Sequence, residues 1–303
     1  MWTHTLGRFG GKMKRKILIG ILSFFGIINI WGKDYQKEAV EFMQNGNYEQ
    51  CLSVLKEWES KEPKNSEINI MYWNYYVYKD AKQITAMGKM PDGRYGMYPK
   101  TVYNKEDVKT AISYLDKILK TYSNRMDIID MKCWSYNYIE DYNSTSELIV
   151  KTIKQSKKNN NEWTWTKNEA PSKYNKPEGE ALLFQMINNS FRYIDLQFEE
   201  NKEIIHKIIE SELSFYPENI YGLNHASVYY QKTGDYKRSI EVLSRAAKIN
   251  PHDYIVIGNL AYSYELAEDY KNAKKWYEYM LNMENPEAIE YGKQGLEAIK
   301  AKN

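Results

Sequence analysis

The stretch "GDYKRSIEVLSRAAKINP" at residues 234–251 decides the fold, because a related stretch, "EDYKNAKKWYEYMLNMENP", follows at 268–286. In both, an acidic residue precedes a tyrosine, and Tyr236 and Tyr270 are 34 residues apart. Each stretch has the pattern of an amphipathic helix that runs to an Asn-Pro pair, where proline cannot continue the helical hydrogen bonding. Recurrence at a fixed period of this length indicates a structural repeat.

A second helix is expected within each period. After Pro251 the sequence "YIVIGNLAYSYELAE" places Ile257, Leu260, Ala261 and Tyr264 at i, i+3, i+4 and i+7, which is one face of a helix. Two short amphipathic helices in 34 residues, joined by a tight turn, predict a helical-hairpin repeat.

The pattern resembles the tetratricopeptide repeat, which has aromatic, large apolar and small residues at fixed places and a proline near its end. With Pro251 as that proline, the matching residues are Leu223, Tyr230, Tyr236, Leu243 and Ala246, and in the next unit Ile257, Ala261, Tyr264, Tyr270, Ala273 and Tyr277. The pair before the second helix also occurs as Asn47-Tyr48 and Asp141-Tyr142. The resemblance implies an all-α fold, a right-handed superhelical solenoid of helix-turn-helix repeats.

About six helix pairs are expected between residues 33 and 303, followed by a capping helix that begins at Pro286. The predicted pairs are 34–65, 66–123, 126–158, 178–219, 220–253 and 254–287. Two insertions, near 87–107 and 157–180, are rich in Gly, Pro and Asn, and we expect both to be loops. The prediction is one helical repeat domain over 33–303.

Residues 1–32 form a separate segment. A basic stretch, "KMKRK" at 12–16, precedes the uncharged run "ILIGILSFFGIINIWG" at 17–32. This order is typical of a signal peptide, and an uncleaved N-terminal membrane anchor is the other interpretation. Either places the rest of the chain in the periplasm or cell envelope, as an exported protein. The chain starts at Met1 or at Met13.

The residues that catalysis needs do not form a recognisable set. The four histidines are scattered without metal-ligand spacing, and no phosphate-binding loop or nucleophile motif occurs. The formal net charge of +2 disfavours a nucleic-acid partner. Cys51 and Cys133 are expected to be free, buried thiols. We therefore predict a non-enzymatic protein without cofactor or metal.

The resemblance places the functional surface in the groove lined by the first helix of each unit. On the two best units the groove positions are Tyr221, Asn224, Val228 and Gln231, then Ile255, Gly258, Tyr262 and Glu265, with His225 and Asn259 adjacent. Asparagine side chains can hold an extended peptide backbone with a paired donor and acceptor. The predicted peptide-binding residues are Tyr221, Asn224, His225, Gln231, Asn259, Tyr262 and Glu265. The expected function is a scaffold or assembly factor of the bacterial cell envelope that binds a protein or peptide.

An alternative function uses the second insertion. Trp163 and Trp165 alternate in "NEWTWT", and an exposed pair of indole rings can stack on sugars. The alternative is then an envelope carbohydrate-binding protein. In a third interpretation the two rings tuck under the insertion and pin it to the helices.

Overall fold

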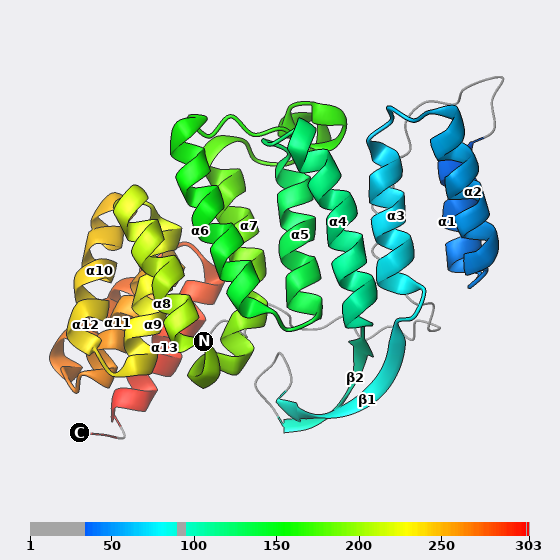
Figure 1. The fold of residues 1–303 in the computed structure, drawn as a ribbon. Helices are drawn as coiled ribbons and strands as arrows, with labels where there is room; N and C mark the ends of the chain where they lie inside the picture. Colours follow the sequence, from blue (N-terminus) through cyan, green and yellow to red (C-terminus); the bar gives the residue numbers. More distant parts are fainter. Residues whose placement is uncertain (1–33, 90–94, 301, 303) are drawn as a thin grey trace. The chain divides into compact units, whose positions relative to one another are not determined.

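The computed structural model describes residues 34–89, 95–300 and 302, and it contains thirteen α-helices and one β-hairpin within these residues (Figure 1). The chain divides into two compact units. Unit 1 holds the residues up to Asp141 together with Trp163–Lys176, and unit 2 holds Tyr142–Glu162 and Pro177–Asn303. The prediction of an all-α repeat protein is confirmed.

The predicted signal or anchor segment, 1–32, lies outside the described residues. Among the residues that are described, none of the helices combines the length and the apolar character that a membrane crossing needs.

Unit 1 contains five α-helices, a hairpin of two strands and two short 3-10 helices within its described part. Their bounds are α1 (Tyr35–Gln44), α2 (Tyr48–Lys61), α3 (Glu67–Tyr78), β1 (Lys82–Lys89), β2 (Tyr95–Val102), α4 (Lys105–Thr121), α5 (Met126–Tyr138), η1 (Thr166–Asn168) and η2 (Pro171–Tyr174). The helices α1 and α2 are the predicted pair 34–65, and α3 and α4 are the pair 66–123, with the hairpin between them.

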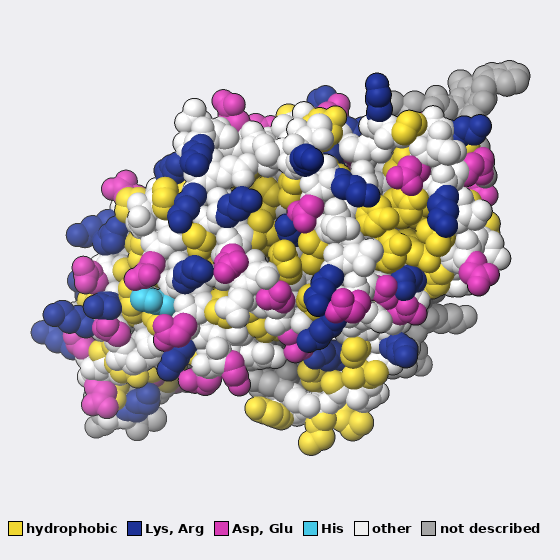
Figure 2. Space-filling view, in the orientation of Figure 1, with side chains coloured by type: hydrophobic (Ala, Val, Ile, Leu, Met, Phe, Trp, Pro, Cys, Tyr) yellow, Lys and Arg dark blue, Asp and Glu magenta, His cyan; other side chains and the backbone are white. Residues whose placement is uncertain are grey.

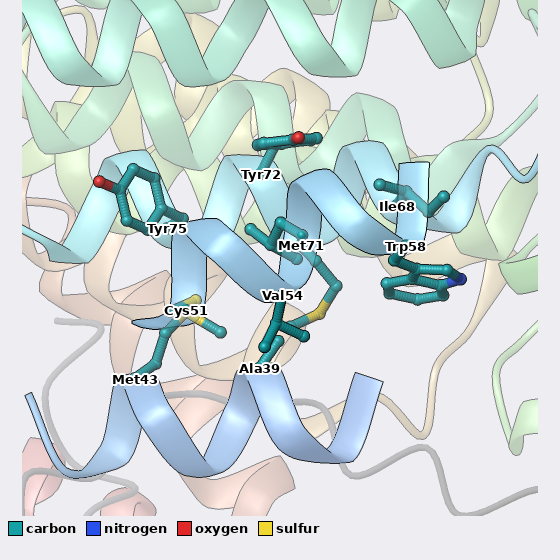
Figure 3. Close-up of a cluster of buried hydrophobic side chains, with 10 residues drawn as sticks. Ala39, Met43, Cys51, Val54, Trp58, Ile68, Met71, Tyr72 and Tyr75 are labelled. Atoms are coloured by element: carbon teal, nitrogen blue, oxygen red, sulfur yellow. The ribbon is translucent and has the colours of Figure 1, made fainter. Parts of the chain in front are cut away.

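The helix α3 lies between two hydrophobic cores, which explains why both of its faces are aromatic. Tyr72 and Tyr75 pack with α1 and α2 in the first core (Figure 3), whereas Trp73 and Val77 pack with α4 and α5 in the second. The indole nitrogen of Trp73 donates a hydrogen bond to Ser135 Oγ at 2.7 Å. A helix with apolar residues on all sides must be buried on all sides, and α3 meets that condition.

The first insertion is not the loop that we predicted over 87–107. β1 and β2 form an antiparallel hairpin with Lys82 opposite Val102 and Met87 opposite Met97, and α4 begins at Lys105. The Pro-Asp-Gly sequence at 91–93 falls between the strands along the chain, so the turn-forming residues mark only the connection. Met87, Tyr95 and Met97 are strongly exposed, so these strands lack the buried apolar residues by which a strand is usually recognised in a sequence.

Unit 2 contains eight α-helices and one 3-10 helix in its described part. They are α6 (Tyr142–Lys158), α7 (Gly179–Ile194), η3 (Asp195–Gln197), α8 (Phe198–Phe215), α9 (Ile220–Thr233), α10 (Tyr236–Ile249), α11 (Tyr254–Leu266), α12 (Tyr270–Leu281) and α13 (Pro286–Lys300). The pairs α7/α8, α9/α10 and α11/α12 match the predicted 178–219, 220–253 and 254–287. The helix α13 packs closely on α12, since a Cβ added at Gly295 would lie 2.2 Å from the Tyr277 ring.

The turn between the two helices of a pair recurs four times with one hydrogen-bond pattern. The residue before the Asx-Tyr pair has a positive φ at Gly46 (74°), Glu140 (59°), Gly234 (81°) and Glu268 (59°). The next backbone N–H reaches back five residues, in the bonds from Asn47 to Phe42, Asp141 to Tyr136, Asp235 to Tyr230 and Asp269 to Tyr264, at 2.8–2.9 Å. This is the Schellman motif, which satisfies carbonyls at a helix C-terminus.

The same turn starts the second helix. Tyr48, Tyr142, Tyr236 and Tyr270 are each the first residue of their helix. Asp235 accepts a hydrogen bond from the backbone N–H of Arg238, and Asp269 accepts one from Asn272, both at 3.1 Å. Asp235 and Asp269 therefore cap α10 and α12. The acidic residue and the tyrosine that recur in the sequence therefore mark a helix C-cap followed at once by an N-cap.

We expect replacement of Glu268 by glycine to stabilise the protein. A non-glycine residue in the left-handed region costs about 1–2 kcal/mol, and glycine removes this cost. Glycine also raises the conformational entropy of the unfolded chain, which offsets part of the stabilisation. The expected net rise in the free energy of unfolding is about 0.5–1 kcal/mol. Urea unfolding of Glu268→Gly measures it. Lys274→Gly, in the exposed middle of α12, is the matched control and should lose about 1 kcal/mol. Equal losses in both variants would contradict the assigned turn.

Candidate functional site

A ladder of polar side chains links the first helices of three consecutive pairs in unit 2. Asn188 on α7 contacts His225 on α9, with 2.7 Å between Asn188 Oδ1 and His225 Nε2. Asn259 on α11 donates from Nδ2 to Asn224 Oδ1 on α9, also at 2.7 Å. His225 and Asn259 occupy equivalent places, 34 residues apart. We call Asn188, Asn224, His225 and Asn259 the polar ladder.

His225 is fixed from behind by a buried carboxylate. Its Nδ1 lies 2.9 Å and 3.1 Å from the two carboxylate oxygens of Glu212, which comes from α8. The exposed fractions are 3% for His225 and 0% for Glu212, and the Phe191 ring stacks on the imidazole with 4.4 Å between ring centroids. A buried carboxylate requires such a partner. His225 therefore holds α7, α8 and α9 together.

Gln231 extends the contacts between α9 and α11. Its Nε2 donates to the backbone carbonyl of Asn259 at 3.2 Å and to Ser263 Oγ at 2.9 Å. The Ser263 hydroxyl also lies 2.8 Å from that of Ser239 on α10. Gln231 is half-buried, so it joins neighbouring helices and retains partial access to solvent.

Glu265 lies at the other end of the predicted site and is already paired. Its carboxylate accepts hydrogen bonds from the Tyr277 hydroxyl at 2.7 Å and from Lys302 Nζ at 2.9 Å. Burial and the neighbouring carboxylate raise the pKa of Tyr277, and burial raises the pKa of Tyr291 to about 12. Tyr262 is half-buried beside this group. These contacts pack α13 against the last helix pair.

Two exposed apolar side chains and an amide pair lie near one another on α9 and α11; of the amides, Asn259 is half-buried and Asn224 is 6% exposed. Tyr221 and Ile255, 34 residues apart, are 53% and 52% exposed. Within the described part of the chain, no hydrogen bond uses Asn224 Nδ2 or Asn259 Oδ1, and neither atom is among the buried polar atoms that lack a partner. Tyr221, Asn224, Ile255 and Asn259 form what we call the α9–α11 face. It combines one amide donor, one amide acceptor and two apolar side chains.

Of the seven predicted site residues, Tyr221, Asn224 and Asn259 belong to the α9–α11 face, where Asn224 and Asn259 bond to each other. His225, Gln231 and Glu265 make other interhelical hydrogen bonds. Tyr262 is half-buried beside Glu265. Sequence reasoning missed Asn188 and Glu212. The pair that contains them ends at Pro217 without a tyrosine at its turn, so the repeat register could not be carried onto it.

The two tryptophans of the second insertion are inside unit 1. Trp163 and Trp165 are 5% and 6% exposed, so neither ring is available to stack on a sugar. Thr164 lies between them and pairs with the start of α5, where the Met126 N–H donates to its carbonyl and its own N–H donates to the Asn124 carbonyl, both at 2.9 Å. The rings pin the insertion to the helices, as in the third interpretation above.

A buried arginine holds the same region. The Arg125 guanidinium, 0% exposed, donates to both carboxylate oxygens of Asp127 at 2.9 Å and 2.6 Å and to Glu67 on α3 at 2.8 Å. The Thr166 hydroxyl reaches the same Asp127 carboxylate at 3.4 Å. The buried charges of Arg125 and Asp127 thus pair with each other, and Asp127 also binds the insertion through Thr166.

No cluster of metal-ligating side chains occurs among the residues that the structure describes. Cys51 and Cys133 are free and buried, as predicted. Burial raises the pKa of the Cys51 thiol to about 11, which keeps it protonated and unreactive at neutral pH.

The helix pairs, their shared turn and the α9–α11 face define a helical-repeat scaffold. Residues 222–253 match the family model of the tetratricopeptide repeat. These residues therefore form a tetratricopeptide repeat, and the resemblance inferred from the sequence is confirmed for this unit. No curated protein sequence matches the chain.

Three solved structures illustrate the level of similarity to this chain. A tetratricopeptide repeat protein from Parabacteroides merdae ATCC 43184 is 13% identical over 84% of this chain and 82% of that one, with a TM-score of 0.38. MamA is 16% identical over 66% and 94%, with a TM-score of 0.34. Acl4, an assembly chaperone of RpL4, is 9% identical over 89% and 96%, with a TM-score of 0.41. All three TM-scores lie below 0.5, so the assignment of the tetratricopeptide repeat rests on the match over residues 222–253.

We expect Glu212→Ala to destabilise unit 2 strongly. The change leaves His225 buried without its carboxylate partner, which should lower the free energy of unfolding by about 3–5 kcal/mol. Glu210→Ala is the matched control on the same helix, because Glu210 is exposed and lies 3.8 Å from His206; it should change stability by less than about 0.5 kcal/mol. Thermal and urea unfolding of the two variants check this. A loss below 1 kcal/mol in Glu212→Ala would show that the pair has no structural role.

Proposed function

We propose that this protein is a non-catalytic scaffold that binds an extended segment of a partner protein on the α9–α11 face. The observation that carries the proposal is a pair of amide atoms, Asn224 Nδ2 and Asn259 Oδ1, that no hydrogen bond uses within the described part of the chain. They belong to two side chains already held by their mutual hydrogen bond, at the edge of the buried polar ladder. An extended peptide presents an alternating N–H and C=O, which such a donor and acceptor can hold at once. Because the ladder fixes both side chains, little side-chain entropy is lost on binding.

The apolar side chains beside the amides suggest what the peptide carries. Tyr221 and Ile255 lie on neighbouring helices at the same place in the repeat, and both are about half exposed. Side chains of an extended peptide alternate in direction, so apolar residues at every second position can contact this pair while the backbone meets the amides. Aromatic and aliphatic anchors of this kind supply most of the binding energy in protein interfaces. The preferred ligand is an extended segment with alternating apolar residues.

A peptide selected on the full-length protein from a random display library, then measured by fluorescence anisotropy, tests the face. We expect Tyr221→Glu/Ile255→Glu to weaken binding at least tenfold, because a buried unpaired carboxylate opposes contact with apolar residues. Ile249→Glu/Tyr279→Glu is the matched control, since both residues are exposed and apolar but lie on α10 and α12. Its affinity should change less than twofold. Equal affinity in all three proteins would remove the face from the proposal.

We also propose that the scaffold acts in the bacterial cell envelope. The support is the basic stretch at 12–16 followed by the uncharged run at 17–32, which has the composition of a signal or anchor segment.

Amino-terminal sequencing of the protein recovered from cells distinguishes a cleaved signal peptide from an uncleaved membrane anchor. A mature chain that starts near residue 33 is expected for a cleaved signal, and a chain that starts at Met1 or Met13 and stays with the membrane fraction is expected for an anchor. A chain that keeps residues 17–32 and is recovered in the cytosolic fraction would contradict the envelope assignment.

A further inference from the structure

Lysines gather on the outer face of α6 in unit 2. Lys151, Lys154 and Lys158 follow one another at spacings of three and four residues, which places them on one side of the helix. Together with Lys207 on α8 they surround a hollow of about 490 Å³. Figure 2 shows dark blue side chains over α6, in the region where this helix meets α8. We call the four lysines and the space between them the basic hollow.

The charge of the basic hollow is not neutralised within the described part of the chain. None of the four lysines has a carboxylate within ion-pair distance there, whereas Lys232 in the same unit pairs with Asp195. The remaining lining residues are Glu147, Val150 and Gln155. Four ammonium groups therefore face a single carboxylate, and like charges at helical spacing destabilise the helix that carries them. An anionic ligand would relieve this repulsion.

The surroundings limit the size of that ligand. On α8, Glu203 and Glu210 lie one turn on either side of Lys207, and both are exposed. An extended polyanion such as a nucleic acid, or the plane of an anionic membrane, would meet these carboxylates beyond the hollow. A short acidic segment can enter the hollow and leave them in solvent. The side chain of Val150 and the lysine stems give it an apolar floor, and the mobile ammonium groups can adjust to individual carboxylates.

We propose that the basic hollow binds a short Asp/Glu-rich segment of a partner protein. The site is independent of the α9–α11 face, because α6 and α8 are the second helices of their pairs and α9 and α11 are first helices. A partner with one apolar extended segment and one acidic segment can occupy both surfaces. Two linked contacts raise affinity through effective concentration without any new interaction at either surface.

A fluorescein-labelled decaglutamate peptide is the probe, measured by anisotropy against the full-length protein at low and high salt. We expect Lys151→Glu/Lys154→Glu/Lys207→Glu to weaken binding at least tenfold and the corresponding Arg variant to retain it. Lys237→Glu/Lys248→Glu/Lys271→Glu changes the net charge equally at exposed positions outside the hollow, and its affinity should fall less than threefold. Wild-type binding should weaken with salt, because exposed charges are screened.

Equal losses in the two triple-Glu variants would overturn the proposal, because binding would then follow net charge alone. Binding of phosphatidylglycerol vesicles through the same lysines, without binding of decaglutamate, would also overturn it in favour of a membrane. Tyr221→Glu/Ile255→Glu should keep its affinity for decaglutamate. The proposal for the basic hollow and the proposal for the α9–α11 face can therefore be refuted independently.

Discussion

The turn that recurs at four places in the chain is the constraint on which the repeats depend. One residue in the left-handed region ends the first helix, and the next residue begins the second, so the two helices are joined without any free linker. Within a unit, as between α9 and α10 and between α11 and α12, this fixes the direction in which the second helix returns, and with it the faces that meet. The turn requires a backbone conformation, a positive φ, and no particular side chain. Gly46 and Gly234 meet this requirement, and so do Glu140 and Glu268. A glutamate there is strained, and the packing of the two helices must compensate for that strain.

The periodic part of the fold could be predicted because the same physical need recurs in it. The asparagine or aspartate and the tyrosine of each turn are visible in the sequence, and the helix pairs over 220–287 follow from them. The hairpin at 82–102 could not be predicted in this way, because Met87, Tyr95 and Met97 face solvent and no alternation of apolar and polar residues marks its strands. For Trp163 and Trp165 the sequence left two interpretations open, an exposed pair and rings packed under the insertion, and the structure shows both rings buried. The contact of the insertion with Asp127, through Thr166, joins residues that are distant in sequence and could not be read from their spacing.

The sequence predicted which residues of the candidate site lie near one another, but not which of them bond to neighbouring helices. The repeat register correctly brings Asn224 and Asn259 to adjacent helices, since both are counted from the same turn. It could not show which amide atoms would be used between helices and which would remain open, because that depends on side-chain geometry. The same holds for His225 and Glu265, whose partners Glu212 and Tyr277 lie on second helices. Polar residues at the predicted groove positions therefore mainly bond to neighbouring helices. Only their donor and acceptor atoms without a partner in the protein can bind a ligand.

This division has a consequence for how a repeat scaffold gains specificity. The first helices carry an amide pair whose geometry is set by the ladder, and such a pair recognises backbone and is tolerant of peptide sequence. The second helices also carry side chains on their outer surfaces, and on α6 these include three lysines. A partner would be selected by two contacts together: a weak contact of its backbone with the α9–α11 face and a contact of its acidic side chains with the basic hollow. Neither contact alone would select it. Selection of this kind requires both surfaces to belong to one compact set of helices, and α6 to α11 all lie in unit 2.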